Sequence, residues 1–576
     1  MKRTCISLLA VALTFAGACT KNSDDKKKEG EGPGAARSTA PTDESAPVAD
    51  TPQRSAVDNA TIDYSFLAPV PADTPFLLAM LRPFPNDFLS YLRDGLTPLT
   101  GMAQLGISAA RDGAEPMSRA ILDELNGNLS VEGMKKLGIT VTPKLAMYAI
   151  GWSLAIRVEL ADGKTFAAVL DRIEKNGGQA MPRGELGGIS YRYVADKDGL
   201  FVVAIVGDQL ALGVMHAAAR DHVLPVLLGT EKPEKSMADA GTVQGLVSKY
   251  KLLGMAMGYF DSPALARMIM GQVSGRSKKI RDVSNGDMPE ISAVCQNEIT
   301  QLVGAVPRLI FGYQNVSAKG YESVFSVELR ADLAREMASL QSASVDLDKL
   351  MAGQPVLAVG ATLSLDAGKA FVEKKFGEFA AKPFQCEFMS DLNRDIGEAA
   401  ADVKTPLPPF VAGAHGLIAV MKELQITGDK PTGKGFAALG VSDPVAAFKE
   451  MQKRNPELRT GSLEKGKSME VPLENMPGIS ATVRADDRWL SFAIGEGMSD
   501  AVSSMLASKG SAKGPFFVVS YDYGALMKLG AKMSPDNDNP MIVRMTEMLG
   551  KFLGYSSTAL YFTDDGVVGR ARTVIR

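Results

Sequence analysis

Cys295 and Cys386 are the residues best suited to redox chemistry or nucleophilic catalysis. Each begins an amphipathic stretch in which apolar residues recur at helical spacing. In an oxidising compartment the two cysteines could form a disulfide that closes a loop of about 90 residues; alternatively, both thiols are buried and act as small apolar groups. A catalytic thiol needs a neighbouring base, and the chain has only three histidines. We therefore expect a disulfide and no catalytic residue at either position.

The three histidines, His216, His222 and His415, do not form a recognisable metal site. His216 and His222 are six residues apart, whereas a spacing of four would place both on one face of a helix. No glutamate accompanies them in the pattern of a zinc protease. We expect ordinary surface and core histidines, with no metal and no cofactor.

Three further patterns imitate binding motifs. Residues 428–435 have the glycine and lysine spacing of a phosphate-binding loop, but Gly435 replaces the hydroxyl residue that would hold Mg²⁺, and the flanking runs indicate a hairpin turn. Residues 536–540 are rich in Asp and Asn but lack the spacing of a calcium loop, so we expect a turn. The basic residues within 276–281 could face lipid headgroups, but a solvated loop is the simpler interpretation.

Methionine is abundant, with 28 residues, and it clusters in two places. Flexible thioethers fill irregular cores, but they also line adaptable apolar binding grooves. The clusters therefore leave two interpretations open, core filling or an apolar cleft. They comprise Met255, Met257, Met268 and Met270, and then Met527, Met533, Met541, Met545 and Met548.

The composition favours a folded, nearly neutral protein. Of 576 residues, 45% are hydrophobic and 22% are charged, which is enough apolar content for packed cores. The length allows two to four domains at about 150 residues each. Because 63 basic residues oppose 66 acidic ones, the charge provides no basic surface for nucleic acid.

The N-terminus has the features of an export signal. Lys2 and Arg3 precede a short apolar stretch, Ile6–Phe15, which is too short to span a bilayer. The small residues of 16–18 then lead to Cys19. This arrangement resembles the lipobox of bacterial lipoproteins, with Ala16 where leucine is usual. The resemblance implies that residues 1–19 are a signal peptide ending at Cys19, whose thiol receives a diacylglycerol carrying acyl chains such as palmitate. The alternative is an ordinary secretory signal that is cut after Ala18.

Residues 20–61 differ sharply from the rest of the chain. They contain no aromatic residue and no Ile, Leu or Met. Such a segment cannot bury enough apolar surface to offset its chain entropy, so we expect a disordered tether with a reach of about 35 Å. In the Gram-negative lipoprotein pattern Asp after the cysteine favours the inner membrane, so Thr20 favours the outer membrane. No later run of 18 apolar residues predicts another membrane span.

The body repeats one order of strand and helix signals. The two copies are predicted to be residues 62–331 and residues 332–576. The alternative is chance similarity, since many α+β proteins reuse hairpins and helices. The matching segments are 320–330 with 566–576, 259–265 with 520–526, 166–169 with 445–448, and the hairpin 201–214 with 479–494.

Alternating apolar residues and short turns predict an α+β fold. We expect two tandem duplicated units of mainly antiparallel sheet, with helices packed on one face. A doubly wound nucleotide-binding fold would need regular strand–helix alternation and a glycine-rich first turn, and neither is present. The string Ala68–Ala79, which contains Pro-Ala-Asp-Thr, resembles the opening strand of an uncharacterised family of bacterial envelope proteins. The family has no established activity, so the resemblance implies no catalytic residue.

Three functions remain as hypotheses. The first is a non-enzymatic, membrane-anchored envelope protein that binds a partner or scaffolds a complex, held to the membrane by the lipid on Cys19. The second is a periplasmic carrier or chaperone for an amphiphile, either a lipid or an unfolded outer-membrane protein. The third is an enzyme whose site is assembled from residues scattered along the sequence.

Overall fold

The structure is a computed structural model. It describes residues 61–90, 107, 110, 111, 113–284, 291–411, 413–427, 430–455, 458, 461–473, 480–533, 550 and 553–575. Among these residues, no helix is both long enough and apolar enough to cross a membrane.

The described strands form one 19-stranded sheet. Those of the first half are β1 (Phe76–Met80), β2 (Leu145–Ile150), β3 (Ser153–Glu159), β4 (Arg183–Leu186), β5 (Ile189–Ala195), β6 (Gly199–Val206), β7 (Gln209–His216), β8 (Met257–Asp261), β9 (Arg308–Ser317) and β10 (Gly320–Glu328). Those of the second half are β11 (Leu357–Ala361), β12 (Gly416–Thr427), β13 (Lys430–Gly440), β14 (Ser468–Pro472), β15 (Ser480–Ala485), β16 (Trp489–Ile494), β17 (Phe517–Asp522), β18 (Leu553–Thr563) and β19 (Gly566–Ile575).

Every pairing between named strands is antiparallel. From one edge to the centre the order is β4-β5-β6-β7-β3-β2-β1-β8-β9-β10. From the centre to the other edge it is β19-β18-β17-β11-β12-β13-β16-β15-β14. The predicted α+β class with mainly antiparallel strands is therefore confirmed.

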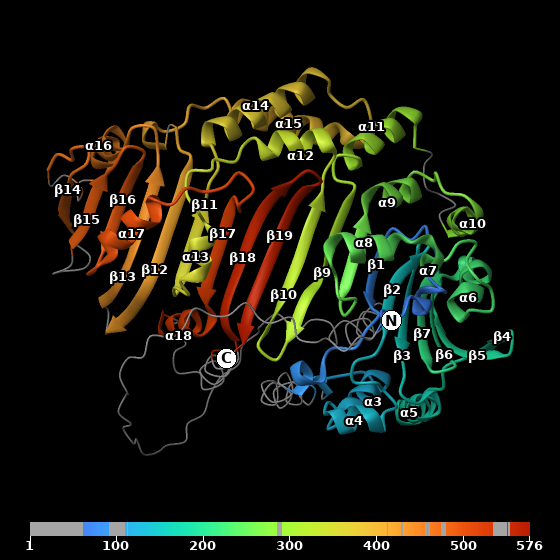
Figure 1. Ribbon diagram of the computed structural model, residues 1–576. Helices are drawn as coiled ribbons and strands as arrows, with labels where there is room; N and C mark the ends of the chain where they lie inside the picture. Colours follow the sequence, from blue (N-terminus) through green and yellow to red (C-terminus); the bar gives the residue numbers. More distant parts are fainter. Residues whose placement is uncertain are drawn as a thin grey trace, which may run out of the picture.

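The halves meet where β10 pairs with β19. Gly320 lies opposite Val574 and Glu328 lies opposite Gly566, so the pairing is unbroken along both strands. The predicted boundary at residue 331 falls at the first residue of α12, three residues after β10 ends, and the sheet continues across it (Figure 1). The local alternation of the two strands predicts each of them but not their partnership, because residues far apart in sequence carry the pairing.

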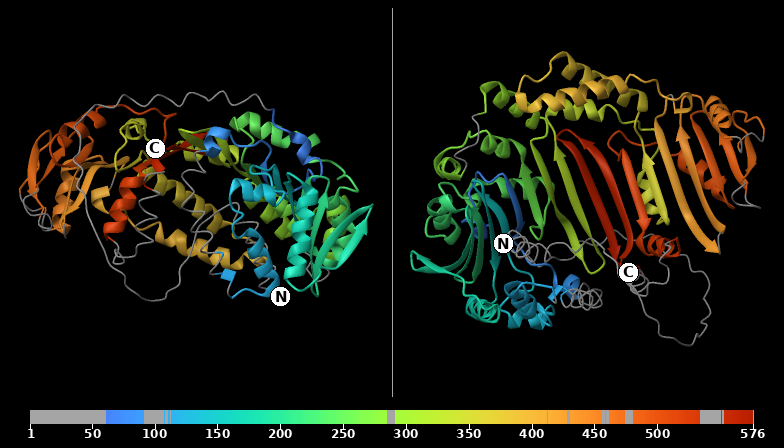
Figure 2. Two further views of the ribbon diagram at one scale, coloured as in Figure 1. Left: turned by 90° about the horizontal axis from the view of Figure 1, so that it is seen from below. Right: turned by 180° about the vertical axis from the view of Figure 1, so that it is seen from behind.

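The sheet is strongly curved. Sheets of more than about ten strands rarely stay open without curling. Seen from below, the two outer ends turn toward the same side, and α14 and α15 lie between them (Figure 2, left). In Figure 1 the same two helices lie across the top of the sheet, beyond the ends of the central strands.

The helices connect and cover these strands. Those of the first half are η1 (Tyr64–Leu67), α3 (Pro116–Leu125), α4 (Val131–Lys136), α5 (Gly163–Asn176), η2 (Ala217–Ala219), α6 (Arg220–Leu228), α7 (Met237–Ala240), α8 (Thr242–Tyr250), α9 (Ser262–Ile269), α10 (Gly275–Ser284) and α11 (Ala293–Val303). Those of the second half are α12 (Ala331–Ala338), α13 (Asp348–Ala352), α14 (Leu365–Ala381), η3 (Glu387–Met389), α15 (Ser390–Asp402), η4 (Pro409–Val411), α16 (Pro444–Arg454), α17 (Met498–Leu506) and α18 (Tyr523–Met533).

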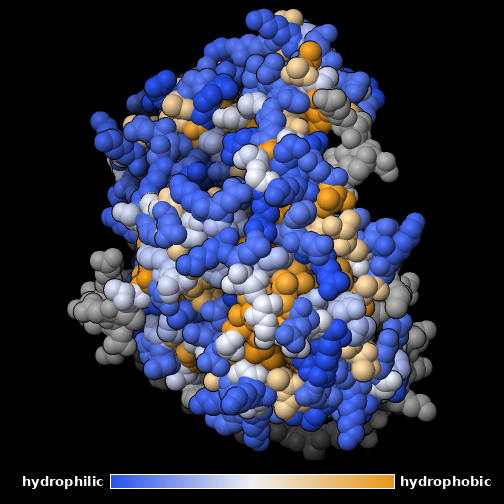
Figure 3. All heavy atoms as spheres, turned by 90° about the vertical axis from the view of Figure 1, so that its right-hand side faces the viewer, coloured by the Kyte–Doolittle hydropathy of each residue, from blue (hydrophilic) through white to orange (hydrophobic). Residues whose placement is uncertain are grey.

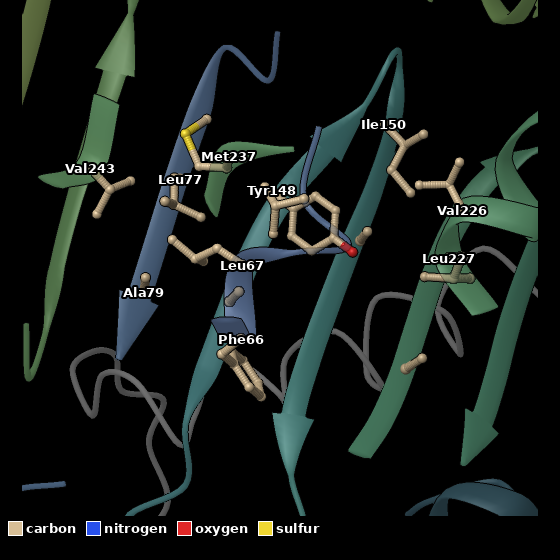
Figure 4. Close-up of a cluster of buried hydrophobic side chains, with 14 of the residues drawn as sticks. Phe66, Leu67, Leu77, Ala79, Tyr148, Ile150, Val226, Leu227, Met237 and Val243 are labelled. Carbon is tan, nitrogen blue, oxygen red and sulfur yellow. The ribbon is translucent and has the colours of Figure 1, made fainter. Parts of the chain in front are cut away.

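Helices cover both faces of the outer strands in the first half. Successive residues of a strand point to opposite faces. Val202 of β6 shares a core with Leu227 of α6, whereas its neighbour Val203 shares a core with Ile173 of α5. Figure 4 shows part of the first core, where Ile150 of β2 faces Val226 of α6.

The second half has the same three layers at its outer strands. Leu490 of β16 shares a core with Phe448 of α16, whereas Trp489 shares a core with Val502 of α17 on the opposite face. The expectation of helices on one face only is therefore not confirmed. The reason is that these outer strands are apolar on both faces, so both faces need a covering layer.

Candidate binding surface

The central strands carry a row of apolar residues that pairing places side by side. These residues point to the side of the sheet opposite α8, α13 and α17. We call this set the central row. From β8 to β12 it consists of Gly258, Phe311, Phe325, Gly569, Leu560, Phe517, Ala361 and Leu417. Figure 2 (right) shows the central strands from this side.

The same line of pairing continues under the helices at both ends. Toward β6 it passes through Leu78, Met147, Ile156 and Leu212 to Val203, which is buried under α5; toward β16 it passes through Leu439 to Leu490, which is buried under α16.

The centre of this line is exposed. Phe311 is 41% exposed, Phe325 is 49% exposed and Leu417 is 47% exposed. Scattered exposed apolar residues are normal on protein surfaces, but a contiguous apolar patch usually marks a binding site. One line of cross-strand pairs therefore supplies core at its two ends and an open apolar surface in its middle.

Two glycines keep the central row flat. A Cβ on Gly258 would lie 2.6 Å from the ring carbons of Phe311, so the missing side chain lets that ring lie against the backbone of β8. A Cβ on Gly569 would lie 3.0 Å from Cδ2 of Leu560. Large side chains of neighbouring strands thus spread over the glycine positions, and the row presents a continuous surface.

Hydroxyl groups lie on the same face as the central row. They lie next to it along the strands, toward the N-terminal end of β10 and the C-terminal end of β19. We call them the hydroxyl patch, and it consists of Ser323, Tyr521, Ser556 and Thr558. Three further hydroxyl residues of this face, Tyr313, Tyr321 and Thr573, are covered: Thr573 is buried, and the two tyrosines pack against Phe84 and the buried cluster around Phe88. The rings of Tyr313 and Tyr321 pack edge to face with centroids 5.6 Å apart, and Oγ of Ser556 lies 3.2 Å from Oγ1 of Thr573. Burial raises the pKa of Tyr313.

The two faces of the central strands differ in charge. On the face of the central row, the described residues of β8, β9, β10, β19, β18, β17 and β11 include no charged side chain. The opposite face of β9, β10 and β19 carries five charged residues. They are Arg308, Glu322, Glu328, Arg570 and Arg572.

A helical hairpin of the second half, α14 and α15, is fixed to the first half. Cys386, just before η3, forms a disulfide with Cys295 of α11, with the Cα atoms 4.6 Å apart. The carboxylate of Glu298, also in α11, accepts hydrogen bonds from the backbone N–H groups of Gln385 and Cys386 at 2.8 and 2.9 Å. Neither α14 nor α15 has a buried residue. Lys374 and Lys375 of α14 also pair with Glu336 of α12, at 2.8 and 2.6 Å. The hairpin is therefore held by its ends, by α11 and by ion pairs to α12, and not by burial in a core.

The histidines make no site. The ring of His216 accepts a hydrogen bond from the backbone of Ala218, and His222 lies in α6. His415 is buried, and its ring packs edge to face on Trp489 with centroids 5.5 Å apart. Burial, with the charge of Arg488, lowers the pKa of His415. No group of acidic, cysteine or histidine residues suited to a metal ion occurs among the described residues.

Sequence reasoning missed two buried charges, Glu174 of α5 and Arg157 of β3. Arg157 is the more deeply buried of the two. Its guanidinium donates to the backbone oxygen of Leu227 and to Oε1 of Gln209, both at 2.7 Å. The neighbouring Tyr148 is fully buried, and this burial raises the pKa of its hydroxyl. Arg157 is only 3% exposed, so no solute reaches it, and its role is to satisfy the C-terminal end of α6.

The methionines of the first cluster fill cores. Met255, Met257, Met268 and Met270 are all buried. Of the second cluster Met527 is half-buried in α18, and Met541, Met545 and Met548 lie outside the described residues. The side chains of the first cluster therefore line no open groove, and the exposed apolar surface is aromatic and aliphatic.

The basic residues at 276–281 correct another expectation. They lie in helix α10, not in a loop. Lys278 pairs with Asp282 one turn later at 2.6 Å, and Arg276 donates to the backbone oxygen of His222 at 2.8 Å. The loop prediction was wrong because it overlooked the helical spacing of this ion pair.

Several predicted features fall elsewhere. Residues 428–435 overlap the β12–β13 hairpin, in which Thr427 pairs with Lys430. Cys19, the segment 20–60 and residues 536–540 lie outside the described residues. Figure 3 shows the right-hand end of Figure 1, where polar side chains predominate and apolar ones gather in patches in the lower half.

Comparison with known proteins found no relative of this chain. No protein-family model, no curated protein and no solved structure matches the chain.

Proposed function

We propose that the protein is a non-enzymatic binding module of the bacterial envelope, anchored in the membrane by a lipid on Cys19. Its ligand lies on the central row. The resemblance of residues 16–19 to a lipobox supports the anchor, and the composition of residues 20–61 supports a tether. Thr20, directly after the cysteine, favours the outer membrane.

One observation carries the binding function. Phe311 and Phe325 lie directly opposite each other on β9 and β10, and both remain close to half exposed in a sheet whose outer strands are covered on both faces. Fully burying a phenylalanine gains about 1.5–3 kcal/mol. In the structure, Phe311 and Phe325 realise only part of this free energy. The rest becomes available when a ligand covers them.

We also propose that the two halves arose by duplication. The strand order from β5 to β10 matches the order from β14 to β19. The helix starts agree as well: Asp162 and Asp443 accept hydrogen bonds from the first backbone N–H groups of α5 and α16. Asp261 and Asp522 do the same for α9 and α18.

The test of the binding function is the affinity for an uncharged apolar dye, Nile red. The protein is the body from Thr20 to Arg576, exported behind an ordinary secretory leader. We expect the double variant Phe311→Ser, Phe325→Ser to bind the dye about tenfold more weakly, which corresponds to about 1.4 kcal/mol. Because each side chain is about half buried, the two substitutions together should lower the free energy of unfolding by about 1.5–3 kcal/mol.

Phe388 provides the matched control. It is 58% exposed but lies in η3, away from the sheet. Phe388→Ser should leave dye affinity within about twofold of the unchanged protein. Equal losses in the control and the double variant, or no dye binding at all, would refute binding on the central row.

A further inference from the structure

We propose that the occupant of the central row is a phospholipid of the membrane to which the chain is tethered. Its acyl chains lie along the row, and its ester and phosphate oxygens face the hydroxyl patch. This inference rests on the proposed binding function and names its ligand. It follows from the chemistry of the face, its dimensions and its backbone pairing.

The backbone of the central strands offers nothing to a peptide. β10 pairs with β9 and β19, and β18 pairs with β19 and β17, so their backbone groups take part in ladders on both sides. An extended peptide binds a sheet by adding to a free edge, and the edges of this sheet, β4 and β14, lie far from the row. The surface therefore disfavours an extended or unfolded chain, whose own backbone polar groups would be buried without partners.

The side chains match an amphiphile. The central row offers only carbon surface, and an acyl chain needs no hydrogen bond from it. The hydroxyl patch on the same strands can donate hydrogen bonds to ester or phosphate oxygens. Ser323 and Phe325 mark this boundary, because they are alternate residues of one strand, about 7 Å apart, and point to the same face.

The dimensions also match. At about 4.8 Å between neighbouring strands, the row from Gly258 to Leu417 is about 34 Å long. The hydrocarbon core of a bilayer is about 30 Å thick, so one acyl chain is about 15 Å long. The row can therefore hold two acyl chains end to end, as a diacyl lipid supplies. The predicted tether keeps residue 61, where the described chain begins, within about 35 Å of the bilayer.

Photo-crosslinking in the living envelope tests the ligand. The full chain with its own leader carries benzoylphenylalanine in place of Phe325, and in separate proteins in place of Phe311 or Phe388. Cells are irradiated, and the purified protein is weighed intact. We expect a mass increase equal to a phospholipid at Phe325 and Phe311, with at least tenfold less adduct at Phe388. An intact Cys295–Cys386 disulfide in each protein shows that it has folded.

The other outcomes overturn the inference in different ways. A discrete protein cross-link at Phe325 replaces the lipid by a protein partner and leaves the binding function standing. An adduct with the mass of a free fatty acid would show that the acyl chain comes from a fatty acid and not from a phospholipid. No adduct at Phe325 and Phe311, or equal lipid adducts at all three positions, removes both the ligand and the binding function.

Discussion

The two central strands, β10 and β19, have equivalent backbones but different side chains. The pairs Gly320–Val574 and Gly566–Glu328 are related by the same offset along the chain, so each residue of β10 has a counterpart on β19. On the open face, Phe325 corresponds to Ala571 and Val327 corresponds to Thr573. Because the strands are antiparallel, equivalent positions lie at opposite ends of the pair. The apolar residues nevertheless lie side by side, at the C-terminal end of β10 and the N-terminal end of β19.

This difference separates what the fold requires from what the surface requires. The glycines at equivalent positions, Gly320 and Gly566, both have positive φ, of 145° and 136°. These glycines allow the backbone conformation, and both strands have one at this position. Phe325 and Ala571 contribute side chains to the open face, and they differ between the strands. The division of the open face into the central row and the hydroxyl patch is therefore a property of the side chains and not of the strand pairing.

The largest predicted effect tests the equivalence of the backbones. Gly320→Ala and Gly566→Ala should each lower the free energy of unfolding by about 3 kcal/mol or more, because the backbone conformation is strained for alanine. The new Cβ would also lie 2.1 Å from the carbonyl oxygen of Thr573 or Val327. Urea unfolding measures both variants.

Gly245 in α8 provides the control for the two glycine variants. A Cβ added at this position would enter open space, with no neighbouring side chain within 4 Å. Gly245→Ala should therefore be neutral or stabilise the protein by up to about 1 kcal/mol. A large loss at only one of the two central glycines would break the equivalence of β10 and β19.

The second prediction compares two helical insertions at equivalent places. α3 and α4 lie between β1 and β2, and α14 and α15 lie between β11 and β12. Only the second insertion is tied by the disulfide, which spans 91 residues. Replacing Cys295 and Cys386 by serine should lower the free energy of unfolding by about 2–4 kcal/mol.

Hydrogen exchange locates the effect of losing the disulfide. Protection should fall in α14 and α15, which have no buried residue to hold them. Protection in α3 and α4 should not change. Equal loss in both insertions would mean that the disulfide supports the whole molecule and not the hairpin alone.

The third prediction exchanges the two surface residues. Phe325→Ala should weaken Nile red binding by about threefold to tenfold, since one aromatic side chain of the central row is lost. Ala571→Phe, at the equivalent position on β19, should not restore the affinity, because its ring would extend over the hydroxyl patch. Full recovery in the double exchange would show that only total apolar area matters.

The smallest predicted effect is a pH dependence confined to the second half. Burial holds the pKa of His415 below its usual value, and Arg488 adds to this effect. In the unfolded chain the pKa is about 6.5, so the unfolded state takes up the proton first. Stability is therefore complete above about pH 6.5 and falls as the pH drops below this value.

Hydrogen exchange at about pH 7 and about pH 5 tests this dependence. Protection of β12, β13 and β16 should fall at the lower pH, and His415→Leu should reduce the difference. β2, the counterpart of β12, contains no histidine, so β2 and β3 should change less. Equal pH effects in both halves, or no effect of the variant, would contradict a role for His415.

Local patterns predicted much of this fold. Alternating residues predict β10 and β19, and the matching segments 166–169 and 445–448 predict helices that the structure shows as α5 and α16. These signals act within one strand or one helical turn, so a single segment contains them. The sequence also places Cys295 and Cys386 in amphipathic stretches, where either a bridge or two buried thiols would fit.

Features that depend on distant pairing could not be read in this way. The central row exists only because two hairpins far apart in sequence, β9–β10 and β18–β19, pair through β10 and β19, which brings Phe325 into register with Gly569 and Leu560. The methionine clusters pointed to a different surface, because abundance does not show burial. Arg157 was missed because its partner is the backbone oxygen of Leu227, 70 residues away, and a backbone group leaves no signal in the sequence.

The central claim is that the open face of the central strands holds a lipid. The most direct measurement is native mass spectrometry of the body, exported to a periplasm and purified without detergent or denaturant. We predict an additional mass equal to one phospholipid, which organic extraction recovers, and its loss in the double variant Phe311→Ser, Phe325→Ser. A bare protein mass, or equal lipid occupancy in the double variant, would contradict the claim.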